Sequence, residues 1–193
     1  MYRILLADDE GIVTNSLSFI IEKNFEGQYE IETAKSGRAA IEAAEHFRPD
    51  IVFMDIQMPG INGIEAMREI RKFAPSVIFV VLTAYDKFDY AKEAIGLGVF
   101  EYLNKPVNQK VVVDVITRAM KELDMRREKR KNDLQVMERL ETVIPVIENG
   151  FIYSILFQEH FDEDIENYKN LLGIETPYGY MMGVVFGDVQ QGN

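Results

Sequence analysis

The chain has no cysteine and only two histidines among its 193 residues. The lack of cysteine excludes disulfide bonds and thiolate zinc sites. His46 and His160 alone leave little material for a histidine-based metal centre or for histidine acid–base catalysis. Carboxylates are therefore expected to carry most of the chemistry.

Long apolar runs are also lacking. No run approaches the roughly 18–20 residues that a membrane helix requires. The apolar stretch at residues 1–6 is too short, and too soon followed by acids, for a secretory signal. We therefore expect a cytoplasmic protein that has no membrane partner.

Positive charge is scarce, because 21 Lys and Arg face 32 Asp and Glu and give a net charge of −11. Nucleic-acid binding requires clustered Lys and Arg. Any contact with DNA is thus expected from a domain absent from this chain. The basic run at 126–131 is interpreted as a solvated helical connector, with a nucleic-acid contact as the less favoured alternative.

Residues 1–123 alternate short apolar runs with amphipathic stretches. This pattern predicts an α/β fold, a doubly wound five-stranded parallel sheet with helices on both faces. Two predicted strands, 51–54 and 77–82, are continuously apolar rather than alternating, as expected of strands covered on both sides. The predicted strands are 3–7, 29–33, 51–54, 77–82 and 100–102, and the predicted helices are 11–24, 37–47, 63–73, 87–96 and one that begins at 108.

The last predicted helix continues beyond the length needed to pack on the sheet. Its apolar face ends near Leu123, and an apolar stripe returns between Leu134 and Ile147. We therefore predict a first domain at 1–123, a helical linker at 124–147 and the start of a second domain at 148–193. The apolar stripe at 134–147 spans only about two heptads, so a coiled-coil homodimer through the linker is one possibility and a homodimer through the first domain is another.

Residues 148–193 resemble two amphipathic helices followed by an apolar strand at 180–186. An apolar strand needs neighbours to bond its backbone and to bury its side chains. No further strand follows before Asn193. We expect this segment to be a partial second α/β domain.

Polar residues follow four of the five predicted strands. In open α/β sheets the ligand site lies at the carboxyl ends of the strands. Three carboxylates at one edge repel one another unless a cation joins them, and Mg²⁺ prefers such oxygen ligands. A hydroxyl and a lysine suit the oxygens of a phosphoryl group. The residues are Asp8 and Asp9 after the first strand, Asp55 after the third, Thr83 after the fourth and Lys105 after the fifth.

Asp55 is the predicted nucleophile, because it follows the middle strand of the predicted sheet. An aspartate can attack phosphorus and form an aspartyl phosphate. Each feature has an ordinary alternative: the Asp8-Asp9 pair could cap a helix, Thr83 could be a packing residue and Lys105-Pro106 could be a turn. Their joint placement favours the functional interpretation.

Four segments that contain these residues, Ile4–Glu10, Met54–Gly63, Leu82–Ala84 and Glu101–Pro106, resemble the receiver domains of bacterial two-component response regulators. The resemblance spans about residues 2–123. It implies a flavodoxin-like sheet with strand order 2-1-3-4-5 and a phosphoacceptor switch rather than an enzyme, with at most self-phosphorylation from small donors and slow autodephosphorylation.

The resemblance also implies roles for individual residues, with a sensor histidine kinase as phosphodonor and Mg²⁺ as cofactor. Asp55 is the phosphoacceptor, and Mg²⁺ is bound by Asp8, Asp9, Asp55 and the backbone carbonyl of Gln57. Thr83, Ala84 and Lys105 contact the phosphoryl group, Tyr102 is the switch aromatic, and Lys105–Pro106 is a cis peptide.

A narrower resemblance concerns Tyr85–Ile95, which is similar to the fourth helix of regulators that carry a C-terminal AraC-type helix-turn-helix domain. The chain departs from that subgroup at Thr83-Ala84, where Ser-Gly is more usual. It also departs from many relatives at Gly11 and Thr14, which replace Pro and Arg. A phosphorylation-dependent transcriptional output is the expectation.

Two other functions are compatible with parts of the sequence. The helix–helix–strand pattern at 148–186 could open an enzymatic output domain such as a nucleotide cyclase. A phosphatase of the haloacid dehalogenase type also forms an aspartyl phosphate, but Gln57 stands where that family carries its second aspartate.

Overall fold

A computed structural model describes residues 1–84, 96–157, 162–176 and 182. The chain divides into two compact units, Met1–Glu128 and Lys129–Asn193. No helix in the described ranges is long and apolar enough to cross a membrane.

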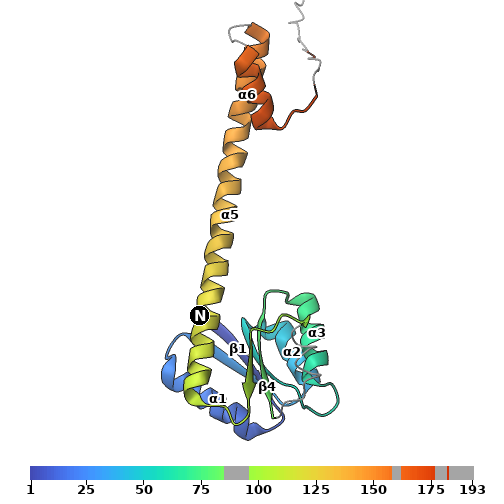
Figure 1. The fold of residues 1–193 in the computed structure, drawn as a ribbon, viewed down its shortest axis with the longest axis vertical. Coiled ribbons are helices and arrows are strands. Elements are labelled where there is room, and N and C mark those ends of the chain that lie inside the picture. Colours follow the sequence, from blue (N-terminus) through green and yellow to red (C-terminus); the bar gives the residue numbers. More distant parts are fainter. Residues whose placement is uncertain (85–95, 158–161, 177–181, 183–193) are drawn as a thin grey trace, which may run out of the picture. The chain divides into compact units, whose positions relative to one another are not determined.

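The first unit is built on a parallel sheet (Figure 1). Its strand order is β2-β1-β3-β4-β5. The predicted doubly wound fold is therefore confirmed, with strand ends shifted by one or two residues. β3 lies at the centre of the sheet between β1 and β4. The strands are β1 Tyr2–Ala7, β2 Tyr29–Ala34, β3 Ile51–Asp55, β4 Ile78–Thr83 and β5 Glu101–Asn104.

Side-chain caps fix the starts of two helices. The Ser36 side chain accepts a hydrogen bond from the backbone N–H of Ala39. Asn62 and Glu65 form a reciprocal capping box, which satisfies backbone donors that the first turn leaves unbonded. The helices are α1 Gly11–Asn24, α2 Gly37–Phe47, α3 Gly63–Phe73, α5 Gln109–Phe157 and α6 Asp162–Leu172. The predicted helix at 87–96 lies outside the described residues, apart from Gly96.

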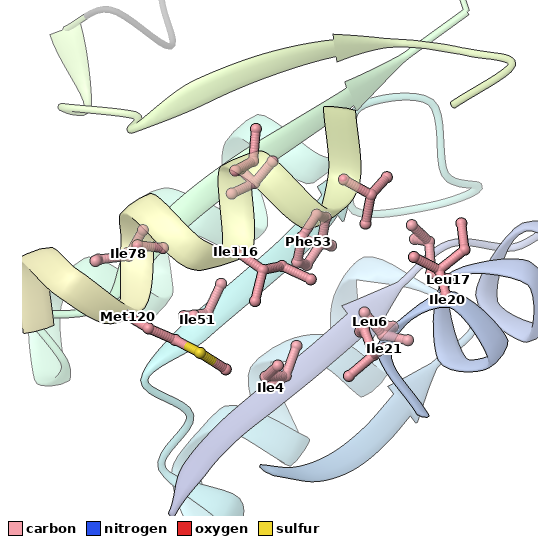
Figure 2. Packing of buried hydrophobic residues seen from close by; sticks show 14 of the residues in the cluster. Ile4, Leu6, Leu17, Ile20, Ile21, Ile51, Phe53, Ile78, Ile116 and Met120 are labelled. Atoms are coloured by element: carbon pink, nitrogen blue, oxygen red, sulfur yellow. The ribbon is translucent and has the colours of Figure 1, made fainter. Parts of the chain in front are cut away.

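Two apolar clusters bury the two faces of the sheet. Figure 2 shows one of them, in which Ile116 of α5 and Leu17 of α1 pack over Ile4 and Phe53. The second cluster joins the opposite face to α2 and α3 and includes Leu5, next to Ile4 in sequence. Successive strand residues point to opposite faces. Burial on both faces therefore explains the continuous apolar runs.

The second unit contains the later part of α5 and all of α6. The sequence pattern predicts a separate helix after residue 148, but α5 continues through that position to Phe157. The rings of Phe151 and Tyr168 lie 6.1 Å apart, and Ser154 is buried. The predicted strand at 180–186 lies outside the described residues, apart from Met182, and the predicted domain boundaries stay predictions.

His46 of α2 contacts Glu32 of β2. His46 Nδ1 lies 2.7 Å from the Glu42 carbonyl, and Nε2 lies 2.9 Å from Glu32 Oε1. The Glu42 contact, followed by Glu32, raises the pKa of His46 above 6.5. Because these contacts favour the protonated ring, they stabilise the fold fully at pH values below 6.5. Their contribution to stability is lost as the pH rises through the pKa of His46 in the folded protein.

We expect Glu32→Gln to lower the pKa of His46 towards 6.5, because the substitution removes the negative partner. Histidine ring signals followed by NMR against pH measure this directly. Glu30→Gln is the matched control, since Glu30 is an exposed residue of the same strand. A wild-type pKa at or below 6.5 would contradict the prediction.

Candidate functional site

Strand register brings the predicted site residues to one edge of the sheet. Ala7 of β1 lies opposite Met54 of β3, so the next residues, Asp8 and Asp55, leave neighbouring strands at the same level. On the other side of β3, Asp55 lies opposite Leu82, one residue before Thr83. The carboxyl ends of β1, β3 and β4 thus meet at one site.

Three carboxylates form a compact acidic cluster at this edge. Asp8 and Asp55 are 0% and 3% exposed, whereas Asp9 is exposed. One oxygen from each of the three residues lies within 4.8 Å of the others. Asp55 Oδ1 is buried and receives no hydrogen bond from the described part of the chain. A buried, unbonded carboxylate oxygen in an all-oxygen cluster fits a hard divalent cation such as Mg²⁺.

Lys105 supplies positive charge to the same cluster. Its Nζ lies 2.7 Å from Asp8 Oδ2 and 3.1 Å from Asp55 Oδ2, and its side chain is 13% exposed. The contact with Asp8 Oδ2 is an ion pair by distance but lacks the angles of a hydrogen bond. The backbone N–H of Lys105 donates to the Thr83 carbonyl at 2.7 Å, which fixes the end of β5 against β4. The Lys105–Pro106 peptide bond is cis, as the resemblance implies.

Burial and charge act in opposite directions on the two central groups. Burial raises the pKa of Asp55, and the nearby Asp8 raises it further, while Lys105 and the backbone N–H of Gln57 lower it, leaving the pKa above its ordinary value. Burial lowers the pKa of Lys105, but Asp8 and Asp55 outweigh this effect and raise it overall. Lys105 is thus held as a cation beside a carboxylate that is costly to ionise.

The other predicted residues lie on β4 or β5, or in the loops that follow β3 and β4. Thr83 is half-buried at the end of β4, and Gln57 and Ala84 are exposed. Tyr102 is half-buried on β5 and packs against the second apolar cluster, and burial raises the pKa of its hydroxyl. The phosphoryl-binding and switch roles of these residues stay predictions.

Gly63 is a supporting residue that the sequence pattern identifies only as the start of a helix. A Cβ atom at this position would overlap the carbonyl oxygen of Asp55. The backbone N–H of Gly63 also donates to the Ile56 carbonyl at 3.0 Å. The first turn of α3 therefore rests on the backbone that carries Asp55. Position 63 could be identified as special only once the approach of α3 to β3 was known.

Comparison with known proteins gives a consistent result. Residues 4–117 match the response regulator receiver domain family. The chain is 36% identical over 143 residues to the uncharacterized transcriptional regulatory protein YesN of Bacillus subtilis, a match that covers 74% of this chain and 39% of YesN. It is 36% identical over 120 residues to the chemotaxis protein CheY of Thermotoga maritima, covering 62% of this chain and 98% of CheY.

A solved structure agrees with these matches. The receiver (REC) domain of AraT, a response regulator from Geobacillus stearothermophilus, superposes with a TM-score of 0.61 at 34% sequence identity. The match covers 65% of this chain and 98% of the AraT domain. The chain thus corresponds to a whole receiver domain plus additional residues, but it spans well under two thirds of the length of YesN.

The contact between Gly63 and Asp55 predicts that Gly63→Ala is destabilising by about 2 kcal/mol or more, since the rigid carbonyl must move to admit a methyl group. Gly11→Ala is the matched control. Gly11 also begins a helix, but a Cβ atom added there would have no neighbour within 4 Å. Its substitution should be neutral or stabilising by up to about 1 kcal/mol. Urea unfolding of both variants measures the difference, and equal effects would contradict the proposed close packing.

Loss of Lys105 should expose the repulsion among the three carboxylates. We expect Lys105→Met to lower the free energy of unfolding by about 3 kcal/mol in EDTA, because it leaves Asp8 and Asp55 without their cation. Added Mg²⁺ should recover more stability in this variant than in the wild type. Thermal unfolding with EDTA or Mg²⁺ measures both effects, with the exposed Lys110→Met as control. A variant as stable as the wild type in EDTA would contradict the role assigned to Lys105.

Proposed function

The chain belongs to the response regulator receiver domain family, and on this premise we propose that it is a phosphorylation-controlled switch with Asp55 as phosphoacceptor. The observation that supports this most directly is the convergence of Asp8, Asp9 and Lys105 on the buried Asp55. All four residues belong to the sequence segments that resemble receiver domains.

In the proposed reaction a side-chain oxygen of Asp55 attacks the phosphorus of a phosphohistidine on a sensor histidine kinase. The new bond joins that oxygen to phosphorus, and the phosphorus–nitrogen bond breaks with its electron pair left on the imidazole. Lys105 lies beside Asp55 and would pair with an oxygen of the transferred group. The Thr83 hydroxyl would donate a hydrogen bond to another.

Asp8, Asp9, Asp55 and the backbone carbonyl of Gln57 would hold Mg²⁺. The ion would neutralise the acidic cluster and the incoming phosphoryl oxygens. Before phosphorylation Lys105 bridges two of these carboxylates. Once the phosphoryl group is in place, Lys105 would exchange one carboxylate contact for a phosphoryl oxygen. The chain thus acts as a switch, and any reaction of its own is limited to self-phosphorylation from small donors and slow loss of the group.

We further propose that the switch controls transcription. This proposal is supported by relatives such as YesN, whose names describe transcriptional regulators. The DNA contact would come from a domain that these 193 residues do not include. The likeness of Tyr85–Ile95 to the fourth helix of regulators with an AraC-type domain supports that subgroup. Residues 85–95 are outside the part of the chain that the structure describes. A cytoplasmic location follows from the same proposal.

We propose that formation of a homodimer transmits the phosphorylation of Asp55 to the output. Several large apolar side chains on the second-unit part of α5 are exposed, which is unusual for a monomer. Phosphorylation would shift a pre-existing equilibrium between two association states. The exposed residues include Leu134, Val136, Met137, Leu140 and Val143.

Phosphoryl incorporation tests the site. With Mg²⁺ and acetyl phosphate, the wild-type chain should gain one phosphoryl group, detected by intact-protein mass spectrometry, and Asp55→Asn should gain none. Asp133→Asn, which alters an exposed carboxylate on α5, should react like the wild type. Incorporation that persists in Asp55→Asn would rule out Asp55 as the acceptor. Light scattering on the same samples should show a larger mass after phosphorylation, and an unchanged mass would rule out the dimer switch.

A further inference from the structure

The first two residues of the basic run, Arg126 and Arg127, contact the amino-terminal edge of the sheet rather than solvent alone. Arg127 Nη2 donates to Asp50 Oδ1 at 2.8 Å, and its guanidinium lies 5.2 Å from the centre of the Tyr2 ring. Arg126 Nη1 donates to the Ser76 carbonyl at 3.3 Å. These contacts lie at the opposite ends of the strands from Asp55.

Asp50, the partner of Arg127, is held in place by three further hydrogen bonds. Asp50 immediately precedes β3, and its second carboxylate oxygen accepts a hydrogen bond from the backbone N–H of Arg3 at 2.9 Å. Its backbone N–H donates to the Arg3 carbonyl, and its carbonyl accepts from Ile78. Asp50 is thus bonded to the starts of β1 and β4. The Asp50 side chain is 17% exposed, so its charge is less screened than that of a free surface residue.

Polar contacts hold the last turn of α5 in the first unit where apolar packing has ended. Leu123 is the last buried apolar residue of α5 on the sheet, and Met125 is exposed. Beyond Leu123, the Tyr2 hydroxyl donates to Asp124 Oδ2 at 2.7 Å. Residues 124–127 therefore stay on the sheet edge through Asp124 and the two arginines, not through burial of apolar surface.

The loop that Arg126 contacts is also bonded by a third arginine. Arg71 of α3 donates to the carbonyls of Pro75 and Val77 at 2.9 and 2.7 Å, on either side of the Ser76 carbonyl that Arg126 contacts. The other end of the Arg71 guanidinium donates to the Leu97 carbonyl at 3.1 Å. Arginines from α3 and α5 thus donate hydrogen bonds to the loop between α3 and β4.

We propose that Arg126 and Arg127 form a latch that fixes residues 124–127, the last turn of α5 in the first unit, to the amino-terminal edge of the sheet. With the latch closed, residues 124–127 belong to the receiver and do not act as a hinge, so the connector begins at a fixed point. Release of the latch would free this turn while leaving the apolar core intact. The latch involves two of the six residues in the run, and the side chains of both are 49% exposed.

Hydrogen exchange on the full chain tests the latch. In Arg127→Gln the backbone amides at 121–127 should exchange about fivefold faster than in the wild type, the change expected when a partly exposed ion pair is lost. Arg130→Gln is the matched control, because Arg130 is an exposed arginine of the same run and the same helix. Its amides at 121–127 should exchange at the wild-type rate.

A double-mutant comparison separates the latch from a general loss of stability. Asp50→Asn should also accelerate exchange at 121–127. The double variant, Asp50→Asn with Arg127→Gln, should exchange no faster than the faster single variant, because both substitutions remove the same ion pair. Exchange in β3 should stay unchanged in Arg127→Gln. Effects that multiply in the double variant, equal exchange in Arg127→Gln and Arg130→Gln, or an unaltered rate in Arg127→Gln would each overturn the proposal.

Discussion

The ion pairs of Lys105 with Asp8 and Asp55 are the interaction on which the site depends. Two buried carboxylates at neighbouring strand ends repel each other, and neither can be moved to solvent without breaking the sheet. A cation must therefore lie between them, and Lys105 occupies that place. Because one oxygen of Asp55 stays buried and unbonded, the cluster keeps room for a second cation. The negative charge that Lys105 leaves unpaired in the cluster favours a bound cation, which the proposed phosphoryl chemistry requires.

The fold meets that demand by rigid placement. Asp55 ends the central strand, whose neighbours β1 and β4 are bonded along their length and whose two faces are buried in separate apolar clusters. α3 begins directly on the Asp55 backbone, and only glycine at position 63 permits this approach. A side chain supported in this way cannot swing away from its neighbours. The electrostatic cost of the cluster is therefore offset by packing energy from the whole sheet.

Much of this arrangement could be predicted from the sequence, for identifiable reasons. Continuous apolar runs such as 78–82 indicate strands buried on both faces, and parallel strands must present their carboxyl ends at one edge. The residues after those strands were therefore known to converge. The direct ion pair between Lys105 and Asp8 could not be predicted, because it depends on how the chain turns after β5. The packing of Gly63 was also hidden, since a glycine after an Asn cap is compatible with many approaches of a helix.

The basic run shows the same limit in a different way. Charge pattern alone could not distinguish a solvated connector from a segment with structural partners, because the partners lie far away in sequence: Asp50 is 77 residues from Arg127. Once the fold is known, β1, β3 and β4 are seen to start near the arginine contacts and to end at the acidic cluster. Strands buried on both faces in a close-packed core resist bending. A change at Asp55 is therefore expected to reach residues 124–127 of α5 by displacement of the loops and helices around the sheet. A latched turn would carry such a displacement into the connector, whereas a flexible hinge would absorb it.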